Sequence, residues 1–450
     1  MTELPRKAAA RTARLAALPL GYAGRHAVGL GKRLGGRPAD AVMSQVQQRT
    51  AEQLFRTLGE LKGGAMKVGQ ALSVLESALP DELAAPYRDQ LTRLQDSAPP
   101  MPTSTVRTQI ARSLGDDWRT RLVHLDGAPT AAASIGQVHR GRWHDAVTDG
   151  ERDVAVKVQY PGAGEALMSD LRQLSRVARS MAPVFPGLDI KPLIEELQAR
   201  AADELDYHLE AEAQAAYAEA FRDDPSIFVP GVVSVGGQVL VTEWLESPYS
   251  LARVVREGTR EERDHYGRLF VTFLFDGPTR TGMLHADPHP GNYRVLPAAD
   301  GGPGRLGVLD FGAVARLPER RLPSAMGRLI RIASESHADD LVAGLRAEGF
   351  IKDKTRVEPQ AVLDYLAPFI EPARHETFRF TRAWMRGQFE RINDSRSPDF
   401  AMATKLNLPS SYLLIHRTWL GGLGLLAQLE AEAPFRALME EHLPGFAMPD

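Results

Sequence analysis

One short stretch constrains the fold more than any other part of the 450-residue chain. Residues 284–296 read LHADPHPGNYRVL, and two prolines prevent this stretch from continuing as a helix. It carries Asp287 and Asn292, and Asp310 follows eighteen residues after Asn292. The segments YRVL and RLGVLD flank a turn rich in Gly, Pro and Asp, so we expect them to pair as antiparallel strands. Such a hairpin would bring Asn292 and Asp310 together at one end.

Asn292 and Asp310 offer the hard oxygen ligands that suit Mg²⁺ when the ion keeps several waters and shares phosphate oxygens. The order H-x-D-x-x-x-x-N followed by D-F-G resembles the catalytic and metal loops of protein-kinase-like phosphotransferases. In those enzymes the Asp orients a hydroxyl or accepts its proton, and the Asn and the DFG Asp hold metal ions. The pattern therefore predicts Asp287 as a catalytic residue, and Asn292 and Asp310 as metal ligands.

The same residues allow two other interpretations. The stretch could be a proline-rich surface turn that is unrelated to a buried DFG segment. Alternatively, His285, Asp287 and His289 could bind zinc, but the prolines disfavour the helix on which two His four residues apart would suit that metal. We expect His285 to brace the loop, and we assign no role to His289.

A kinase-like site also needs a phosphate-binding Lys and a Glu that positions it. The apolar segment VAVK ends in Lys157, which by itself would be an ordinary solvated strand end. Its candidate partners lie in DELDYHLEAE, within a segment that we expect to form one long helix. On such a helix Asp206 and Glu210 share a face, and Glu204 lies about 120° away from Glu210. A solvated acidic face is the other interpretation, and we take Glu210 as the catalytic partner of Lys157.

The loop that covers the phosphates should read G-x-G-x-x-G-x-V, but residues 131–138 read AAASIGQV and keep only Gly136. Alanine carries a Cβ atom, which disfavours positive φ and close approach to phosphate. This segment is either a nucleotide loop of altered geometry or no nucleotide loop at all. In the segment VTEWLES, the backbone carbonyl of Glu243 and the backbone amide of Leu245 would face the adenine of the nucleotide. The expected nucleotide-binding residues are Ala131, Ala132, Ala133, Ser134, Val138, Lys157, Glu243 and Leu245.

Six segments occur in the order that is typical of one family: MKVGQ, AAAS, VAVKVQYPG, ELDYHLEAE, HADPHPGN and LDFG. Over roughly residues 45–315 the chain thus resembles the AarF/ABC1/UbiB atypical kinases, the coenzyme Q kinase-like (ADCK-type) proteins. The resemblance implies an α+β, bilobal protein-kinase-like fold, mostly helical, with a helical N-terminal extension packed over the cleft. It implies binding of ATP or ADP with Mg²⁺, ATPase activity, and support of isoprenoid quinone or related lipid metabolism.

The resemblance also implies a regulatory contact between the extension and the cleft. Lys67 and Gln70 of the K-x-G-Q segment would meet the acids Glu204 and Asp206 there. Many relatives carry an Asn shortly after these acids, where this chain has Ala213 followed by Gln214. Two rival functions stay open: a phosphotransferase that acts on a small molecule or a lipid hydroxyl, and a nucleotide-gated scaffold for a lipid-modifying complex.

Apolar periodicity, a proline-rich linker that ends at residue 102 and a change to helical patterns after residue 249 predict four parts. They are a basic flexible arm (1–44), the helical extension (45–102), a kinase-like N-lobe (103–246) and a helical C-lobe (247–450). Residues 1–49 contain nine Lys or Arg and two Asp or Glu, which indicates either a solvated, partly disordered arm or a weak contact with an anionic membrane surface.

The amino-acid composition limits the kinds of partner that we expect the chain to bind. With 54 Lys and Arg against 57 Asp and Glu, the net charge of −3 gives no sign of a nucleic-acid partner. The expected partners are a nucleotide and isoprenoid lipids or lipid-biosynthesis proteins. The absence of cysteine excludes disulfides and thiolate metal sites and fits a reducing cytoplasm, so we expect a cytoplasmic protein with at most peripheral contact with the inner face of the membrane.

The apolar stretch 413–429 is too short for a membrane span and carries His416 and Arg417. We expect instead a buried helix that begins after Pro409, with Ser410 as its N-cap.

Overall fold

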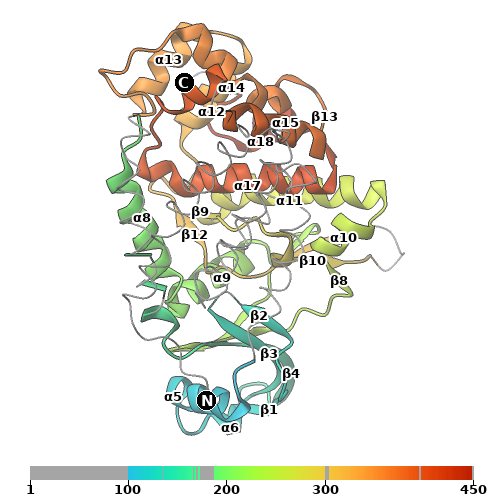
Figure 1. Ribbon diagram of the computed structural model, residues 1–450. Coiled ribbons are helices and arrows are strands. Elements are labelled where there is room, and N and C mark those ends of the chain that lie inside the picture. The colour runs from blue at the N-terminus through green and yellow to red at the C-terminus, as the bar shows by residue number, and fades with distance from the viewer. Residues whose placement is uncertain are drawn as a thin grey trace, which may run out of the picture.

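The computed structural model describes residues 100–447 except 134, 166, 169–170, 173–186, 299–303 and 395–396. It contains two lobes, a smaller one built around an antiparallel sheet and a larger helical one (Figure 1). The basic arm, residues 45–99 of the expected extension with Lys67 and Gln70, and Ser134 lie outside the described residues. Among the residues that are described, we find no helix with both the length and the hydrophobicity that a membrane span requires.

The smaller lobe is a twisted sheet with a helix packed on one face. Its strands follow the order β1-β3-β4-β7-β6, and β2 pairs with β3. The bounds of its elements are α5 Thr103–Leu114, α6 Trp118–Arg121, β1 Leu122–Leu125, β2 Ala131–Ala133, β3 Gly136–Asp145, β4 Gly150–Gln159, β6 Val232–Gly236 and β7 Val239–Glu243.

The alternation of residues along β4 decides where Lys157 points. Val154, Val156 and Val158 are fully buried in one core cluster with residues of α5. Because successive side chains of a strand point to opposite faces of the sheet, Lys157 lies on the face away from α5. This is the face that is turned toward the larger lobe.

The prediction of one long helix over the acidic segment is wrong. The chain forms two helices there, α8 (Ile190–Asp203) and α9 (Tyr207–Ala220). Asp206 is the N-cap of α9, and its carboxylate accepts a hydrogen bond from the backbone N–H of His208 at 2.9 Å. Capping satisfies a backbone donor that has no partner within the helix, so an Asp at this position favours a new helix start. Asp206 and Glu210 therefore do not share a face of one continuous helix.

Helix α9 connects the two lobes. Its first turns place Tyr207 and Ala211 in a cluster with Leu240 of the small sheet. Its last turns place Tyr217 in the large hydrophobic core of the other lobe, together with Phe221 at the end of the helix.

The larger lobe is mostly helical and carries several short strands. Its helices are α10 Leu251–Glu257, α11 Arg260–Thr281, α12 Ser324–Ser334, α13 Ala338–Ala347, α14 Pro359–Arg374, α15 Arg382–Asn393, α16 Pro398–Ala403, α17 Leu413–Leu429 and α18 Phe435–His442. Its strands and 3-10 turns are β5 Ile227–Phe228, β8 Tyr249–Ser250, β9 Met283–His285, η3 Pro290–Asn292, β10 Tyr293–Leu296, β11 Arg305–Val308, β12 Val314–Arg316, β13 Phe378–Arg379, η4 Ser410–Tyr412 and β14 Glu432–Ala433.

The predicted hairpin between YRVL and RLGVLD is confirmed. Strands β10 and β11 pair antiparallel, with Tyr293 opposite Val308. The backbone N–H of Leu309 donates to the carbonyl of Asn292 at 2.8 Å, so the ladder continues to the end at which Asn292 and Asp310 lie. Strand β5 adds to β11 in parallel, although residues 227–228 fall in the segment expected for the N-lobe.

The apolar helix after Pro409 is confirmed as α17, which runs beside α11 across the larger lobe (Figure 1). The predicted cap is wrong, because Ser410 lies within the 3-10 turn η4 and the N-cap of α17 is Tyr412. The chain instead enters α17 through the 3-10 turn η4, in which the Tyr412 N–H donates to the Pro409 carbonyl at 2.9 Å. A tight turn of this kind uses the backbone donor that a side-chain cap would otherwise satisfy.

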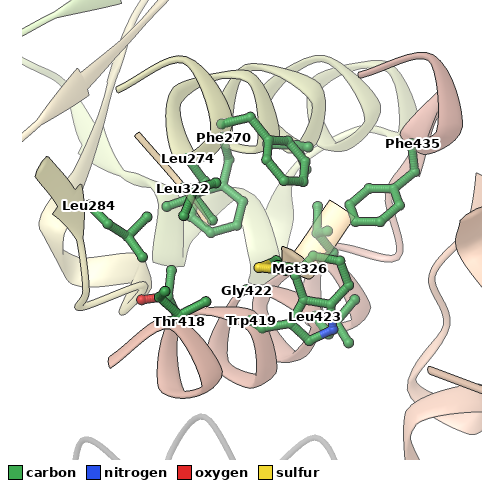
Figure 2. A pocket seen from close by; sticks show the side chains of 14 residues that line it. Phe270, Leu274, Leu284, Leu322, Met326, Thr418, Trp419, Gly422, Leu423 and Phe435 are labelled. Atoms are coloured by element: carbon green, nitrogen blue, oxygen red, sulfur yellow. The ribbon is translucent and has the colours of Figure 1, made fainter. Parts of the chain in front are cut away.

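A small apolar cavity lies in the core of the larger lobe, between side chains of α11 and α17 (Figure 2). Its volume is about 40 Å³. The Thr418 hydroxyl on its wall donates to the Leu414 carbonyl at 2.8 Å, so it is already satisfied within α17. Ligand sites need about 300 Å³ or more and several available polar groups. We therefore interpret this cavity as a packing gap and not as a nucleotide site.

Candidate active site

A second cavity, of about 340 Å³, lies between the two lobes and differs from the first in being partly polar. Many of the residues selected from the sequence line it: Ala131, Ala132, Ala133, Val138, Lys157, Glu210, Glu243, Leu245, Asn292 and Asp310. Its size falls in the range of small-molecule sites. The chain therefore brings together, from both lobes, residues that are up to 179 positions apart in the sequence.

Lys157 is held between two carboxylates on the wall of this cavity. Its Nζ lies 2.6 Å from Oε1 of Glu210 and 3.2 Å from Oδ1 of Asp310. Glu210 is buried in the first turn of α9, and the Lys157 side chain is 14% exposed. Burial alone would lower the pKa of Lys157, but the Asp310 and Glu210 charges outweigh burial and raise it. The ammonium is thus fully charged at neutral pH and is fixed in position.

Asp310 adopts an uncommon backbone conformation. Its φ is +59°, in the left-handed region that Asp tolerates better than most residues. The N–H of Gly312 donates to Asp310 Oδ1 at 3.2 Å, and the buried ring of His285 contacts the Asp310 carbonyl through Nε2 at 3.0 Å. His285 also packs edge-on against Phe311, with 5.2 Å between ring centroids. The expected bracing role of His285 agrees with these contacts.

Asp287 and Asn292 are joined directly by hydrogen bonds. The Asn292 side-chain Nδ2 donates to the Asp287 carboxylate at 3.0 Å and to its carbonyl at 3.2 Å. With its nitrogen committed to Asp287, Asn292 retains an amide oxygen as a ligand. That oxygen and the Asp310 carboxylate, both on the cavity wall, form the kind of donor set that suits Mg²⁺. Within the described part of the chain, no group of three or more His, Asp or Glu has metal-binding geometry, so the zinc alternative finds no support there.

The alanine segment forms strand β2 and pairs with β3, with Ala131 opposite Val138. The one glycine that remains serves the sheet, because a Cβ atom on Gly136 would lie 2.3 Å from the Val158 carbonyl oxygen. Ala131 and Ala132 are exposed at the cavity edge, whereas Ala133 is buried. The segment is therefore a paired strand and not a flexible glycine loop.

Glu243 and Leu245 also line the cavity, where the chain leaves the small sheet at the end of β7. The Glu243 carboxylate accepts from the Gly231 N–H at 2.9 Å, and the Glu243 N–H donates to the Gly231 carbonyl at 2.9 Å. Because its side chain is engaged in this way, Glu243 would contribute to a ligand site through its backbone carbonyl.

The expected regulatory acids do not line the cavity. Asp206 is exposed and caps α9, and Glu204 is buried at the break between α8 and α9. Their expected partners Lys67 and Gln70 lie outside the described residues.

Two basic residues were missed from the sequence, one on the cavity wall and one beside Asp287, which itself is not among the residues that line the cavity. Arg294 of β10 lines the cavity, and burial lowers its pKa. The alternation of buried Tyr293 and Val295 could have indicated it, since the residue between them must point to the other face. Arg417 of α17 lies 3.4 Å from Asp287 Oδ1, and no motif marks it.

A small antiparallel lobe, a helical lobe and a Lys–Glu–Asp cluster between them define a protein-kinase-like domain. A sequence profile described as the ABC1 atypical kinase-like domain matches residues 93–338. The chain belongs to this family, and the assignment made from its motifs is confirmed. The overall α+β kinase-like fold is confirmed with it.

Among curated proteins, the chain is 31% identical over 333 residues to the mitochondrial atypical kinase coq-8 of Caenorhabditis elegans. That match covers 73% of this chain and 42% of the relative. It is 29% identical to the chloroplastic protein Activity of BC1 complex kinase 1 of Arabidopsis thaliana, over 69% of this chain and 44% of the relative. The chain thus spans less than half the length of these curated relatives.

A solved structure, that of Rv3197 from Mycobacterium tuberculosis in complex with erythromycin, is 41% identical in sequence. It covers 92% of this chain and all of its own, with a TM-score of 0.65. The similarity therefore extends well beyond the residues that the family profile matches.

Proposed function

We propose that the chain binds ATP or ADP with Mg²⁺ in the cavity between the lobes and transfers the γ-phosphoryl group to water or to a hydroxyl acceptor. The observation that carries this proposal is Lys157, a charged ammonium fixed between Glu210 and Asp310 on the wall of a cavity of about 340 Å³. A fixed cation beside oxygen ligands for a metal is the arrangement that phosphoryl transfer requires.

Each residue has a distinct part in this proposal. Lys157 binds phosphate oxygens and Glu210 holds Lys157 in place. Asn292 and Asp310 hold Mg²⁺, which when bound neutralises phosphate charge. The adenine of the nucleotide lies between the two lobes. It lies against residues that were expected from the sequence and that also line the cavity: Ala131, Ala132, Ala133, Val138, Glu243 and Leu245.

Asp287 orients the attacking hydroxyl. The hydroxyl oxygen forms a bond to the γ-phosphorus, and the bond from that phosphorus to the β,γ-bridging oxygen breaks with its electron pair on ADP. The hydroxyl proton passes to the Asp287 carboxylate and then to solvent. With water as acceptor the reaction is slow ATP hydrolysis, and with an alcohol it is phosphorylation.

We infer that this activity supports isoprenoid quinone or related lipid metabolism, as the family resemblance implies, with peripheral contact at a membrane. A dedicated small-molecule or lipid phosphotransferase and a nucleotide-gated scaffold are the two alternatives. The two alternatives can be distinguished by measurement. The phosphotransferase needs a phosphoryl acceptor, whereas the scaffold needs nucleotide binding without ATP turnover.

The test is ATP turnover by the purified protein with Mg²⁺, in the presence and absence of vesicles that contain a quinone-like lipid. An acceptor screen with labelled γ-phosphate runs alongside it. Lys157→Ala should abolish turnover, whereas Lys191→Ala removes a 79% exposed lysine of α8 and should leave it unchanged. Turnover that survives in Lys157→Ala would overturn the proposal. Binding without turnover would favour the scaffold, and a labelled acceptor would favour the phosphotransferase.

The solved Mycobacterium relative adds one ligand to this experiment. Erythromycin is titrated into the protein with and without MgATP, because that relative was solved in complex with erythromycin. Competition between the two would place the macrolide in the cavity between the lobes, and independent binding would place it elsewhere.

A further inference from the structure

Helix α17 brings a positive charge beside Asp287. Arg417 Nη2 lies 3.4 Å from Asp287 Oδ1, and the Arg417 and Asp287 side chains are 42% and 14% exposed. Within the part of the chain that the structure describes, Arg417 is the one cation that pairs with Asp287. The helix lies outside residues 93–338, which the family profile matches.

The carboxylate of Asp287 needs two contacts to hold one orientation. The terminal torsion of an Asp side chain is broad, so a single hydrogen bond leaves the carboxylate plane free to rotate. Asn292 donates to Oδ2 at 3.0 Å, and Arg417 lies against Oδ1. With both oxygens engaged, the plane of the carboxylate is set.

A second contact fixes the helix against the same loop. Gly421 lies four residues after Arg417 and hence on the same face of α17. A Cβ atom on Gly421 would lie 2.4 Å from Cγ of Pro288, so only glycine permits this approach. Neighbouring residues of the loop, Asp287 and Pro288, thus meet residues one turn apart on α17.

The loop itself supplies no comparable charge. His285 and His289 are the other basic side chains of the loop near Asp287, and burial lowers the pKa of both despite the nearby Asp287 charge. The His289 Nδ1 accepts a hydrogen bond from the Gly291 N–H at 3.1 Å. Lys157 is committed to Glu210 and Asp310. Arg417 is therefore the charge that the fold provides beside Asp287.

We propose that Arg417 is a positioning residue for Asp287: it holds the carboxylate in the orientation in which Asp287 receives the proton of the attacking hydroxyl. The proposal rests on the proposed phosphoryl-transfer function and extends it to a helix beyond the matched domain. It also gives a reason for the arginine in a largely apolar helix. The helix supplies a side chain that the catalytic loop lacks.

Four proteins form the kinetic test: the parent, Arg417→Gln, Asp287→Asn and the double variant. Arg417→Gln should lower kcat for ATP turnover about 100-fold, the usual cost of a misplaced catalytic group. The Kd for MgATP, measured by calorimetry, should stay within about twofold, because Arg417 acts through Asp287 and not on the nucleotide. The double variant should match Asp287→Asn, since Arg417 has nothing to orient once the carboxylate is gone.

Two further variants separate positioning from a structural effect. Arg417→Lys keeps the charge and should recover turnover to within about tenfold of the parent, since it restores a cation without the planar fork. Arg436→Gln breaks an ion pair with Glu440 on α18, in which the arginine is also 42% exposed, and should leave turnover unchanged.

A readout that needs no turnover is hydrogen–deuterium exchange of residues 284–296 in the presence of MgADP. Exchange there should rise in Arg417→Gln and stay parent-like in Arg436→Gln. Parent-like turnover and exchange in Arg417→Gln would overturn the proposal. It would also be overturned if Arg417→Gln lowered kcat by the same factor in the parent and in the Asp287→Asn variant. A parent protein without turnover would overturn the proposed function, while faster exchange in Arg417→Gln would still support the contact.

Discussion

Tyr217 on α9 donates its hydroxyl hydrogen bond to the backbone carbonyl of Met283, with 2.6 Å between the two oxygens. Tyr217 is fully buried, and its ring centroid lies 4.9 Å from that of Phe311. Met283 begins β9, the strand that leads into the loop of Asp287. Glu210 lies two turns earlier on the same helix. One helix therefore connects the buried ion pair of the small lobe to the catalytic loop of the large one.

Removing this hydroxyl should destabilise the protein. Tyr217→Phe leaves the Met283 carbonyl with the weaker Thr281 hydroxyl contact at 3.3 Å. We expect the free energy of unfolding to fall by about 1–3 kcal/mol, as for other buried groups that lose a partner. Urea denaturation at pH 7 measures it. Tyr365→Phe is the control, because Tyr365 is half-buried and its hydroxyl makes no hydrogen bond with another of the residues that the structure describes. Equal losses in the two variants would show that the Met283 contact is not the cause.

Glu210→Gln should impair turnover far more than it impairs folding. The buried Lys157 keeps its contact with Asp310 at 3.2 Å, so the loss of stability should stay below the about 3–5 kcal/mol of a fully orphaned buried charge. Turnover should fall about 100-fold because the ammonium is no longer held in position. The control, Glu212→Gln, lies on the same helix and removes a 66% exposed carboxylate paired with Arg316. If the two variants turn over ATP equally, Glu210 has no role in positioning Lys157.

His285 should make stability fall at mildly acidic pH. Burial lowers its pKa below the ordinary 6.5, although the Asp287 charge opposes burial. Between the lowered pKa and 6.5, the unfolded chain binds a proton at this position and the folded chain does not. Stability from His285 is therefore fully present above pH 6.5 and is lost as the pH falls through this window. Urea denaturation at pH 7.5 and 5.5 should show a smaller difference for His285→Gln than for the parent. An equal difference would mean that other groups carry the pH dependence.

The parts of the site that sequence reasoning reached are those with local causes. Strand alternation places Lys157 opposite the buried valines of β4, and a turn between two apolar runs predicts the hairpin that joins Asn292 to Asp310. The Lys157 contact with Glu210 links a strand to a helix, and it was reached through the kinase-like pattern and not through periodicity alone.

The errors arise where two local preferences compete or where no local signal exists. The acidic segment keeps a helical period across Asp206, but capping by the same residue starts a new helix. Arg417 follows Asp287 by 130 positions, and only the packing of α17 on the loop brings the two together. No periodicity within α17 distinguishes an arginine that pairs with a catalytic carboxylate from one that is solvated.

The most direct test of the account is calorimetric titration of ATP into the parent and Asp310→Asn, with Mg²⁺ and with EDTA. If Asp310 holds the metal that the nucleotide shares, Mg²⁺ should tighten ATP binding in the parent, and Asp310→Asn should lose that increment. Circular dichroism establishes that the variant is folded. The same Mg²⁺-dependent gain in affinity in a folded Asp310→Asn protein would contradict the assignment of this cavity as a metal–nucleotide site.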